Sequence, residues 1–354
     1  MSCPGGSFRG RTAAALLAAV VALVAATAQP ALAGQKARQP VRLAAGASAF
    51  PAAVLSGVAA RTGCPVQVVP PVAPGSVPAP GTDLVELPGA DAGALIASGS
   101  LAVIDERTVS GLGDVPGSLR DAVRDASGGL RAVPYLWSPQ LLLARRSVYG
   151  AQPPASLRGL FSRNGAARAA LPDSPLELAI AARYLGIGDA FSLSHDELAS
   201  AREVLAPAEP LLHFYGDAAT LRSLFRRNRI DLALGNAATL GDQRGAVVAV
   251  LPSEGTIATE RVLGLVASTK HGLCARRIAG ALLGPLAQSQ LAAARGLLSV
   301  RAATCSALTD EACNALKRAL SQTLANSTVA VHPVAADGVA GWPEWLGEWV
   351  ILHG

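Results

Sequence analysis

Short apolar strands alternate with short helices along most of the chain after residue 40, and this alternation constrains the fold more than any other feature. The clearest strand segments are 41–44, 66–69, 83–87, 132–135, 141–144, 167–171, 213–215, 230–234, 247–251 and 262–266. The helical segments between and after them are 50–60, 90–97, 173–185, 195–205, 218–227, 274–294 and 308–324. Such alternation produces parallel sheets that helices cover on both faces. Because 354 residues are enough for about two domains, the sequence predicts a two-domain α/β fold.

Three local features refine this pattern. Five prolines fall within residues 70–81, which predicts a loop because proline has no backbone donor for a helix or a central strand. Asp173 begins an Asp-Ser-Pro sequence, which is typical of a helix start. Trp342, Trp345 and Trp349 fall on one face of a short C-terminal helix. This spacing favours packing into the core, with a platform that stacks on a ligand as the alternative.

The first residues have the three parts of a secretory signal peptide. Arg9 and Arg11 precede an apolar run at 12–27, and Ala31-Leu32-Ala33 follows it. The run is shorter than the ~20 residues that cross a bilayer. The sequence therefore predicts a signal peptide at 1–33 and a soluble protein in the periplasm or outside the cell.

Export changes the interpretation of the cysteines. Four remain beyond the signal peptide, and an even number in an oxidising compartment favours disulfides. Cys305 and Cys313 are near enough in sequence for a local bridge, which leaves Cys64 to pair with Cys274. Buried free thiols are the alternative. A metal site is not expected, because the five histidines have no metal-ligand spacing around them.

The sequence has no short motif typical of catalysis. It contains no Gly-x-Ser-x-Gly elbow, no phosphate-binding loop and no paired metal ligands. The formal net charge of +5 is small and scattered, which argues against a nucleic-acid partner. We therefore expect neither enzymatic activity nor a cofactor.

Five short sequences follow one another along the chain: D-L-V-E-L-P at 83–88, V-P-Y-L-W at 133–137, F-Y-G-D at 214–217, I-D-L-A-L-G at 230–235 and L-P-S-E-G at 251–255. In order and spacing this series resembles the periplasmic spermidine/putrescine-binding proteins of ABC importers. The resemblance implies a two-lobed periplasmic-binding-protein fold, with a mostly parallel sheet in each lobe and hinge crossovers between the lobes. It places lobe 1 at 40–145 plus 262–300 and lobe 2 at 146–261 plus 301–354.

The resemblance also implies a function. Such a protein captures a small polar solute in the cleft between its lobes, closes around it, and delivers it to the membrane subunits of an ABC permease. We expect this chain to do so as a monomer.

The positions at which the family holds its ligand are altered in this chain. In place of the usual contacts stand Gly46, Gly89, Asp91, Asn236 and Thr259, with Arg261 at an acidic position and Asp173 as the remaining ligand carboxylate. An arginine within ~4 Å of an ammonium group would repel it by about 4 kcal/mol at an effective dielectric near 20. It would instead bind a carboxylate or phosphate with two parallel hydrogen bonds. We therefore expect an altered ligand, either a polyamine or an amino-acid-like solute.

Each of the polar candidates also has a purely structural interpretation. Asp173 and Asp91 suit helix starts, and Asn236 suits a turn at a strand end. Arg261 could form a salt bridge with Glu260 or Asp231. The altered positions together leave a second hypothesis open, a receptor that has lost its ligand and acts as a protein-interaction or sensor module.

Overall fold

A computed structural model describes residues 39–153, 155–161, 168–236, 240, 243, 245–301 and 310–353. The predicted signal peptide at 1–33 lies outside these residues. Cys305 also lies outside them, and the side chain of Cys313 is not among those described. The Cys305–Cys313 bridge therefore stays a prediction.

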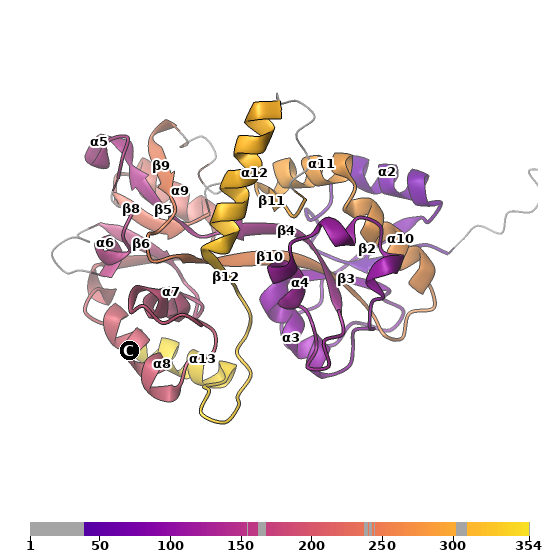
Figure 1. The fold of residues 1–354 in the computed structure, drawn as a ribbon, viewed down its shortest axis with the longest axis horizontal. Helices are drawn as coiled ribbons and strands as arrows, with labels where there is room; N and C mark the ends of the chain where they lie inside the picture. Colours follow the sequence, from indigo (N-terminus) through magenta and orange to yellow (C-terminus); the bar gives the residue numbers. More distant parts are fainter. Residues whose placement is uncertain are drawn as a thin grey trace, which may run out of the picture. The chain divides into compact units, whose positions relative to one another are not determined.

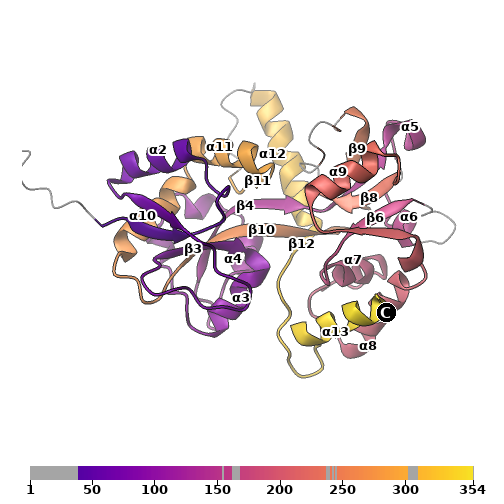
Figure 2. The same cartoon turned by 180° about the vertical axis from the view of Figure 1, so that it is seen from behind.

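Two mixed β-sheets organise the described chain (Figures 1 and 2). The first has seven strands: β1 (Val41–Ala44), β2 (Val66–Val69), β3 (Leu84–Pro88), β4 (Ala132–Pro139), β10 (Thr256–Leu265), β11 (Leu298–Ser299) and β12 (Ser327–Val329). Their order is β11-β4-β10-β3-β1-β2, with β12 paired to β10. Strands β2, β1 and β3 are parallel to one another, whereas β10 is antiparallel to both β3 and β4.

Helices cover both faces of the first sheet. They are α2 (Ala52–Thr62), α3 (Gly89–Ala97), α4 (Gly117–Asp121), α10 (Gly272–Leu282) and α11 (Pro285–Arg295), with short 3-10 turns at Glu106–Thr108 and Leu112–Asp114. Helix α2 packs on α10 and α11. Helix α3 lies on the opposite face of the sheet from α2 and α11 (Figures 1 and 2).

The second sheet has five strands in the described residues: β5 (Leu141–Arg145), β6 (Ala169–Pro172), β7 (Leu212–Tyr215), β8 (Leu232–Gly235) and β9 (Val247–Val250). Their order is β7-β6-β8-β5-β9. The remaining helices are α5 (Arg146–Tyr149), α6 (Arg158–Phe161), α7 (Glu177–Tyr184), α8 (His195–Leu205), α9 (Ala218–Arg226), α12 (Asp310–Ala325) and α13 (Trp342–Leu352), with a 3-10 turn at Glu209–Leu211. Helices α7, α8 and α13 pack together on one face of the sheet, and α9 lies on the other (Figures 1 and 2).

The predicted α/β fold with two sheets is confirmed, but the sheets are mixed rather than mostly parallel. The chain passes from β4 in the first sheet to β5 in the second through Gln140 alone. Strand β10, which follows the last strand of the second sheet, enters the first sheet antiparallel to β3 and β4. The first strand after each passage between the sheets, β5 in the second sheet and β10 in the first, is therefore antiparallel to the parallel strands of its sheet. The exact lobe boundaries remain a prediction.

Local sequence signals account for several element ends. Helix α8 has the predicted bounds, because Ser194 and Glu197 form a capping box at its start. Helix α2 ends at Gly63, whose φ of 64° is the left-handed conformation that glycine adopts readily. The single helix predicted at 274–294 is instead two helices, since Pro285 cannot continue the hydrogen bonding of α10.

Two further predictions are tested by the packing. A disulfide joins Cys64, next to β2, to Cys274 in α10, with 5.7 Å between the Cα atoms. This predicted pairing is confirmed. Trp345 and Trp349 are buried in the core of the second sheet, as expected, whereas Trp342 is only partly buried. None of the described helices combines the length and hydrophobicity needed to cross a membrane.

Candidate functional site

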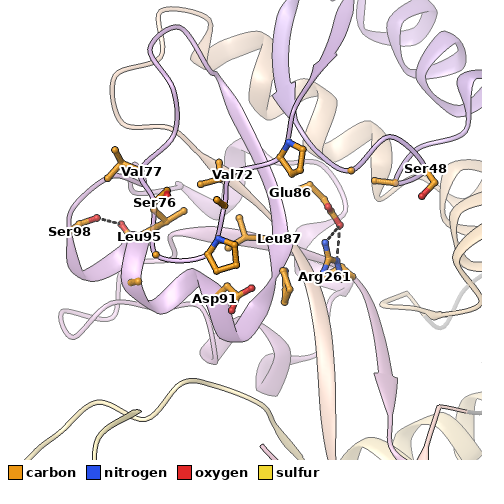
Figure 3. A pocket seen from close by; sticks show the side chains of 18 of the residues that line it. Ser48, Val72, Ser76, Val77, Glu86, Leu87, Asp91, Leu95, Ser98 and Arg261 are labelled. Atoms are coloured by element: carbon orange, nitrogen blue, oxygen red, sulfur yellow. Dashed lines mark hydrogen bonds and ion pairs between the residues drawn. The ribbon is translucent and has the colours of Figure 1, made fainter. Parts of the chain in front are cut away.

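A cavity of about 450 Å³, here called the first cavity, opens at the carboxyl ends of β1 and β3 (Figure 3). Gly46 and Ser48 follow β1, residues 86–88 end β3, and Asp91 lies in the first turn of α3. The loop at 71–77 forms another wall, and the predicted absence of a helix there is confirmed. The volume lies within the ~300–1,000 Å³ typical of small-molecule sites.

The strand order explains why a cavity forms here. From β1 the chain continues to β2 on one side and then returns past β1 to β3 on the other side. Where the order of parallel strands reverses in this way, the loops that follow the strands diverge and leave a crevice at their carboxyl ends. The first cavity occupies this position.

A buried carboxylate organises the charges of the first cavity. The Glu86 side chain is 1% exposed, and its Oε1 accepts a hydrogen bond from Arg261 Nε at 2.7 Å (Figure 3). The same oxygen accepts hydrogen bonds from Tyr135 Oη at 2.8 Å and Arg295 Nη1 at 3.2 Å. Burial raises the pKa of Tyr135 well above its usual range, so the phenol keeps the proton that it donates. One carboxylate thus faces two guanidinium groups, and the cluster carries a net charge of +1.

Both arginines keep donors for a ligand. Their side chains are 24% and 19% exposed, and both line the cavity. Among the described residues, no acceptor lies within hydrogen-bonding distance of Arg261 Nη1 or of Arg295 Nε and Nη2. A guanidinium group has five N–H donors, so the wall of the first cavity can hydrogen-bond an anionic group.

Asp91 lies between the first cavity and a smaller one. Its Oδ1 is 3.5 Å from Nε2 of His332, and burial lowers the pKa of this histidine. The second cavity, of about 230 Å³, shares Pro88 and Asp91 with the first. The two cavities therefore meet at the start of α3.

The second cavity is lined by elements of both sheets. Gly89 and Thr259 belong to the elements around the first sheet, and Ser174 precedes α7 of the second. Trp342, at the start of α13, stacks on His332 with a centroid distance of 3.9 Å. Trp342 is partly buried, packs against the core of the second sheet and lines this cavity. The alternative hypothesis of a platform that stacks on a ligand stays a prediction for this ring.

Glu260 also lines the second cavity and has no hydrogen-bond partner among the described residues. It is 2% exposed, and burial raises the pKa of its carboxyl well above the usual range. Its side chain lies against Gly89, where an added Cβ would be 2.7 Å from Oε1. Position 89 therefore has no room for a side chain.

The structure distributes the predicted ligand residues over several places. Gly46, Asp91 and Arg261 line the first cavity, and Gly89 and Thr259 line the second together with Asp91. Asn236 lines a third cavity of about 660 Å³ with residues of β9 and α11.

Asp173 lies beside α13, where its Oδ1 accepts a hydrogen bond from Trp349 Nε1 at 3.3 Å. It does not cap α7 as predicted, because that helix begins only at Glu177.

Sequence reasoning missed Glu86, Arg295 and the buried position of Glu260. Glu86 interrupts an apolar strand, and this was the available signal. The partner of Arg261 is Glu86 rather than Glu260 or Asp231, since the side chains of Glu260 and Arg261 leave β10 on opposite sides. Arg295 follows Glu86 by 209 residues, and no local pattern connects them.

The described residues contain no candidate metal site. No three histidine, cysteine, aspartate or glutamate side chains in this part of the chain converge as a metal site requires. The groups around the first cavity are arranged to hold a charged molecule by hydrogen bonds.

No protein-family model matches the sequence. Solved structures do match its fold. The spermidine/putrescine ABC transporter substrate-binding protein PotD of Streptococcus pneumoniae is 13% identical, with a TM-score of 0.70 over 89% of this chain and 97% of that one. The TpPotD lipoprotein of Treponema pallidum is 15% identical, with a TM-score of 0.70 over 89% and 99%.

A third similar structure is described as a GABA receptor, at 15% identity and a TM-score of 0.67 over 89% of this chain and 98% of the other. These identities are low, so the likeness concerns the fold. The chain has the two-lobed fold of the spermidine/putrescine ABC transporter substrate-binding proteins, and its resemblance to them is confirmed at that level.

Proposed function

We propose that the protein is an exported solute-binding protein that captures a small polar solute and delivers it to an ABC permease. Two solved structures with the same fold, described as an ABC transporter substrate-binding protein and as a GABA receptor, support the general role. The proposal involves no bond making or breaking, and it needs neither a cofactor nor a metal. The protein would act as a monomer outside the cytoplasm once residues 1–33 are removed.

The observation that carries the proposal is the pair of partly exposed guanidinium groups in the first cavity. Glu86 neutralises one positive charge, and the second remains for a ligand, whereas Asp91 adds a negative charge on the α3 side of the cavity. The side of the cavity at the guanidinium groups is thus suited to a carboxylate, and it repels the ammonium groups of a polyamine. An amino-acid-like solute fits this charge better than spermidine does, and the similar GABA receptor supports that class.

The test is a calorimetric titration of the purified protein with butanoate, 4-aminobutanoate and spermidine. We expect the two carboxylates to bind and Arg261→Lys to weaken them by about tenfold or more, because lysine keeps the charge but loses the planar fork. Arg226→Lys, on the exposed side of α9, is the matched control and should change nothing. Equal affinities for the wild type and Arg261→Lys would contradict the proposal.

A charge reversal tests the same side chain from the opposite direction. Arg261→Asp should strengthen the binding of spermidine, because it replaces a repulsive charge by an attractive one. Unchanged or weaker binding would place Arg261 outside the ligand site.

A ligand-free receptor that serves as a protein-interaction or sensor module is the second candidate. The stacked side chains of Trp342 and His332 favour this candidate, because they fill part of the space between the sheets that a ligand would otherwise occupy. In that case no small molecule would raise the melting temperature. A true solute at 100 times its Kd stabilises the folded state by about 2.7 kcal/mol.

A further inference from the structure

Glu260 is a buried acidic side chain that neither the core nor the ion pairs of the first cavity explain. Both of its carboxyl oxygens lack hydrogen-bond partners among the described residues. Leaving a buried polar atom unpaired costs about 1–3 kcal/mol, and more for a charged group. An apolar side chain at this position would avoid that cost, so the carboxyl needs another reason to be there.

The surroundings of Glu260 in the second cavity favour a cationic guest. Asp91 is a second acidic group on the same cavity, and His332 beside it is neutral because burial lowers its pKa. Trp342 lines the same cavity, and although His332 is stacked on one face of its ring, the indole is partly exposed and attracts cations. An anion would meet two acidic groups here, and an apolar guest would leave the carboxyl oxygens unpaired.

An ammonium group meets these requirements. It carries three N–H donors for the two unpaired oxygens of Glu260, and its charge suits both the carboxylate and the indole face. A small cavity of about 230 Å³ accommodates such a head group with the first part of its carbon chain.

The two cavities are placed to hold opposite ends of one molecule. Arg261 and Glu260 are consecutive residues of β10, and their side chains line different cavities. The cavities meet at Pro88 and Asp91, where β3 ends and α3 begins. A guest that passes this junction can reach the guanidinium groups with one end and Glu260 with the other.

We propose that the second cavity binds the ammonium end of the solute whose carboxylate end the first cavity binds. This inference rests on the proposed function and narrows its ligand to compact zwitterions, such as ω-amino acids with a short carbon chain. Glu260 is the residue that selects them over simple carboxylates.

Three probes of similar length separate the two ends: butanoate, butylammonium and 4-aminobutanoate. We expect the wild-type protein to bind 4-aminobutanoate at least tenfold more tightly than butanoate. Glu260→Gln should abolish this preference and leave the affinity for butanoate unchanged. Glu203→Gln, on the exposed side of α8, is the matched control and should keep the preference. Trp342→Leu should weaken 4-aminobutanoate about 3- to 30-fold by removing the ring face.

Proton release on binding distinguishes direct contact of Glu260 with the ligand from a purely structural role of this side chain, because a structural role would not change the number of protons released. Proton release can be measured by calorimetry at pH 7 in buffers of different ionisation enthalpy. Binding of 4-aminobutanoate should release a proton from the wild type, because the Glu260 carboxyl ionises when it contacts the ammonium group. Binding to Glu260→Gln should release none. Asp91 and His332 line the same cavity and are present in both proteins.

The outcomes distinguish this inference from the proposed function. A wild-type protein that binds butanoate and 4-aminobutanoate equally would overturn the ammonium site and leave the carboxylate site standing. An unchanged preference in Glu260→Gln would also overturn it. If butylammonium binds the wild type but not Glu260→Gln, the ammonium site is supported, even if butanoate does not bind. A failure of butanoate to bind would contradict only the carboxylate site. Failure of all three probes would overturn both.

Discussion

Glu177 makes the stability of this protein depend on pH in a way that can be calculated. The side chain is 1% exposed in the first turn of α7, and its Oε1 accepts a hydrogen bond from Gln140 Nε2 at 2.8 Å. Its other oxygen has no partner among the described residues. Burial raises the pKa of Glu177 to about 8, from an ordinary value of 4.5. The folded protein therefore holds a proton that the unfolded chain loses near pH 4.5.

The direction of the effect follows from this difference. The stabilisation is fully present below pH 4.5, where both states are protonated, and it is lost as the pH rises toward 8. One unit of pKa difference corresponds to about 1.4 kcal/mol. The free energy of unfolding should therefore fall by about 5 kcal/mol between pH 4.5 and 8 on account of Glu177.

Glu177→Gln removes the titrating group while keeping its shape and a hydrogen bond to Gln140. Urea unfolding of the two proteins at intervals from pH 4.5 to 8.5 measures the effect. We expect similar stabilities at pH 4.5 and a variant that is more stable by several kcal/mol at pH 8. Other buried acids, such as Glu260, titrate in both proteins and cancel in the difference.

Glu203→Gln, at an exposed position of α8, should follow the wild type at every pH. Parallel stability curves for the wild type and Glu177→Gln would refute the reasoning, because they would show that Glu177 titrates alike in the folded and unfolded states.

Two further predictions concern stability and use thermal or urea unfolding. Gly89→Ala should destabilise the protein by about 1–3 kcal/mol, because its Cβ would overlap Glu260. Gly93→Ala in the same helix has open space around it and should raise the free energy of unfolding by up to about 1 kcal/mol. Equal effects of the two substitutions would contradict the packing of Gly89 against Glu260. Replacing both Cys64 and Cys274 by alanine should lower the free energy of unfolding by about 5 kcal/mol, since their bridge closes a loop of 210 residues. An unchanged unfolding midpoint would show that the bridge does not form.

Much of the fold could be predicted from sequence because local signals specify it. The capping box at Ser194 sets the start of α8, and Gly63 sets the end of α2. The Cys64–Cys274 pairing was also predictable, because the other two cysteines beyond the signal peptide are close together in sequence. The single helix predicted at 274–294 was wrong because Pro285 cannot continue the hydrogen bonding of α10 and instead begins a second helix.

The candidate site was less predictable because its groups meet only in the folded chain. Arg261 was identified as an altered ligand position, yet its partner Glu86 precedes it by 175 residues in the sequence. Arg295, the second arginine bound to Glu86, belongs to helix α11. Asp173 was predicted to cap a helix and instead contacts Trp349, near the far end of the chain. Sequence patterns report neighbours along a helix or strand, whereas charge clusters of this kind depend on which strands pair.

A crystal structure of the protein soaked with 4-bromobenzoate would locate a bound carboxylate directly, because bromine can be placed by its anomalous scattering. The account predicts the halogen near the start of α3 and the carboxylate oxygens within about 3 Å of a guanidinium nitrogen of Arg261 or Arg295. A carboxylate bound away from both arginines, or well-ordered crystals soaked at saturating concentration whose cavities contain no bromine, would contradict it.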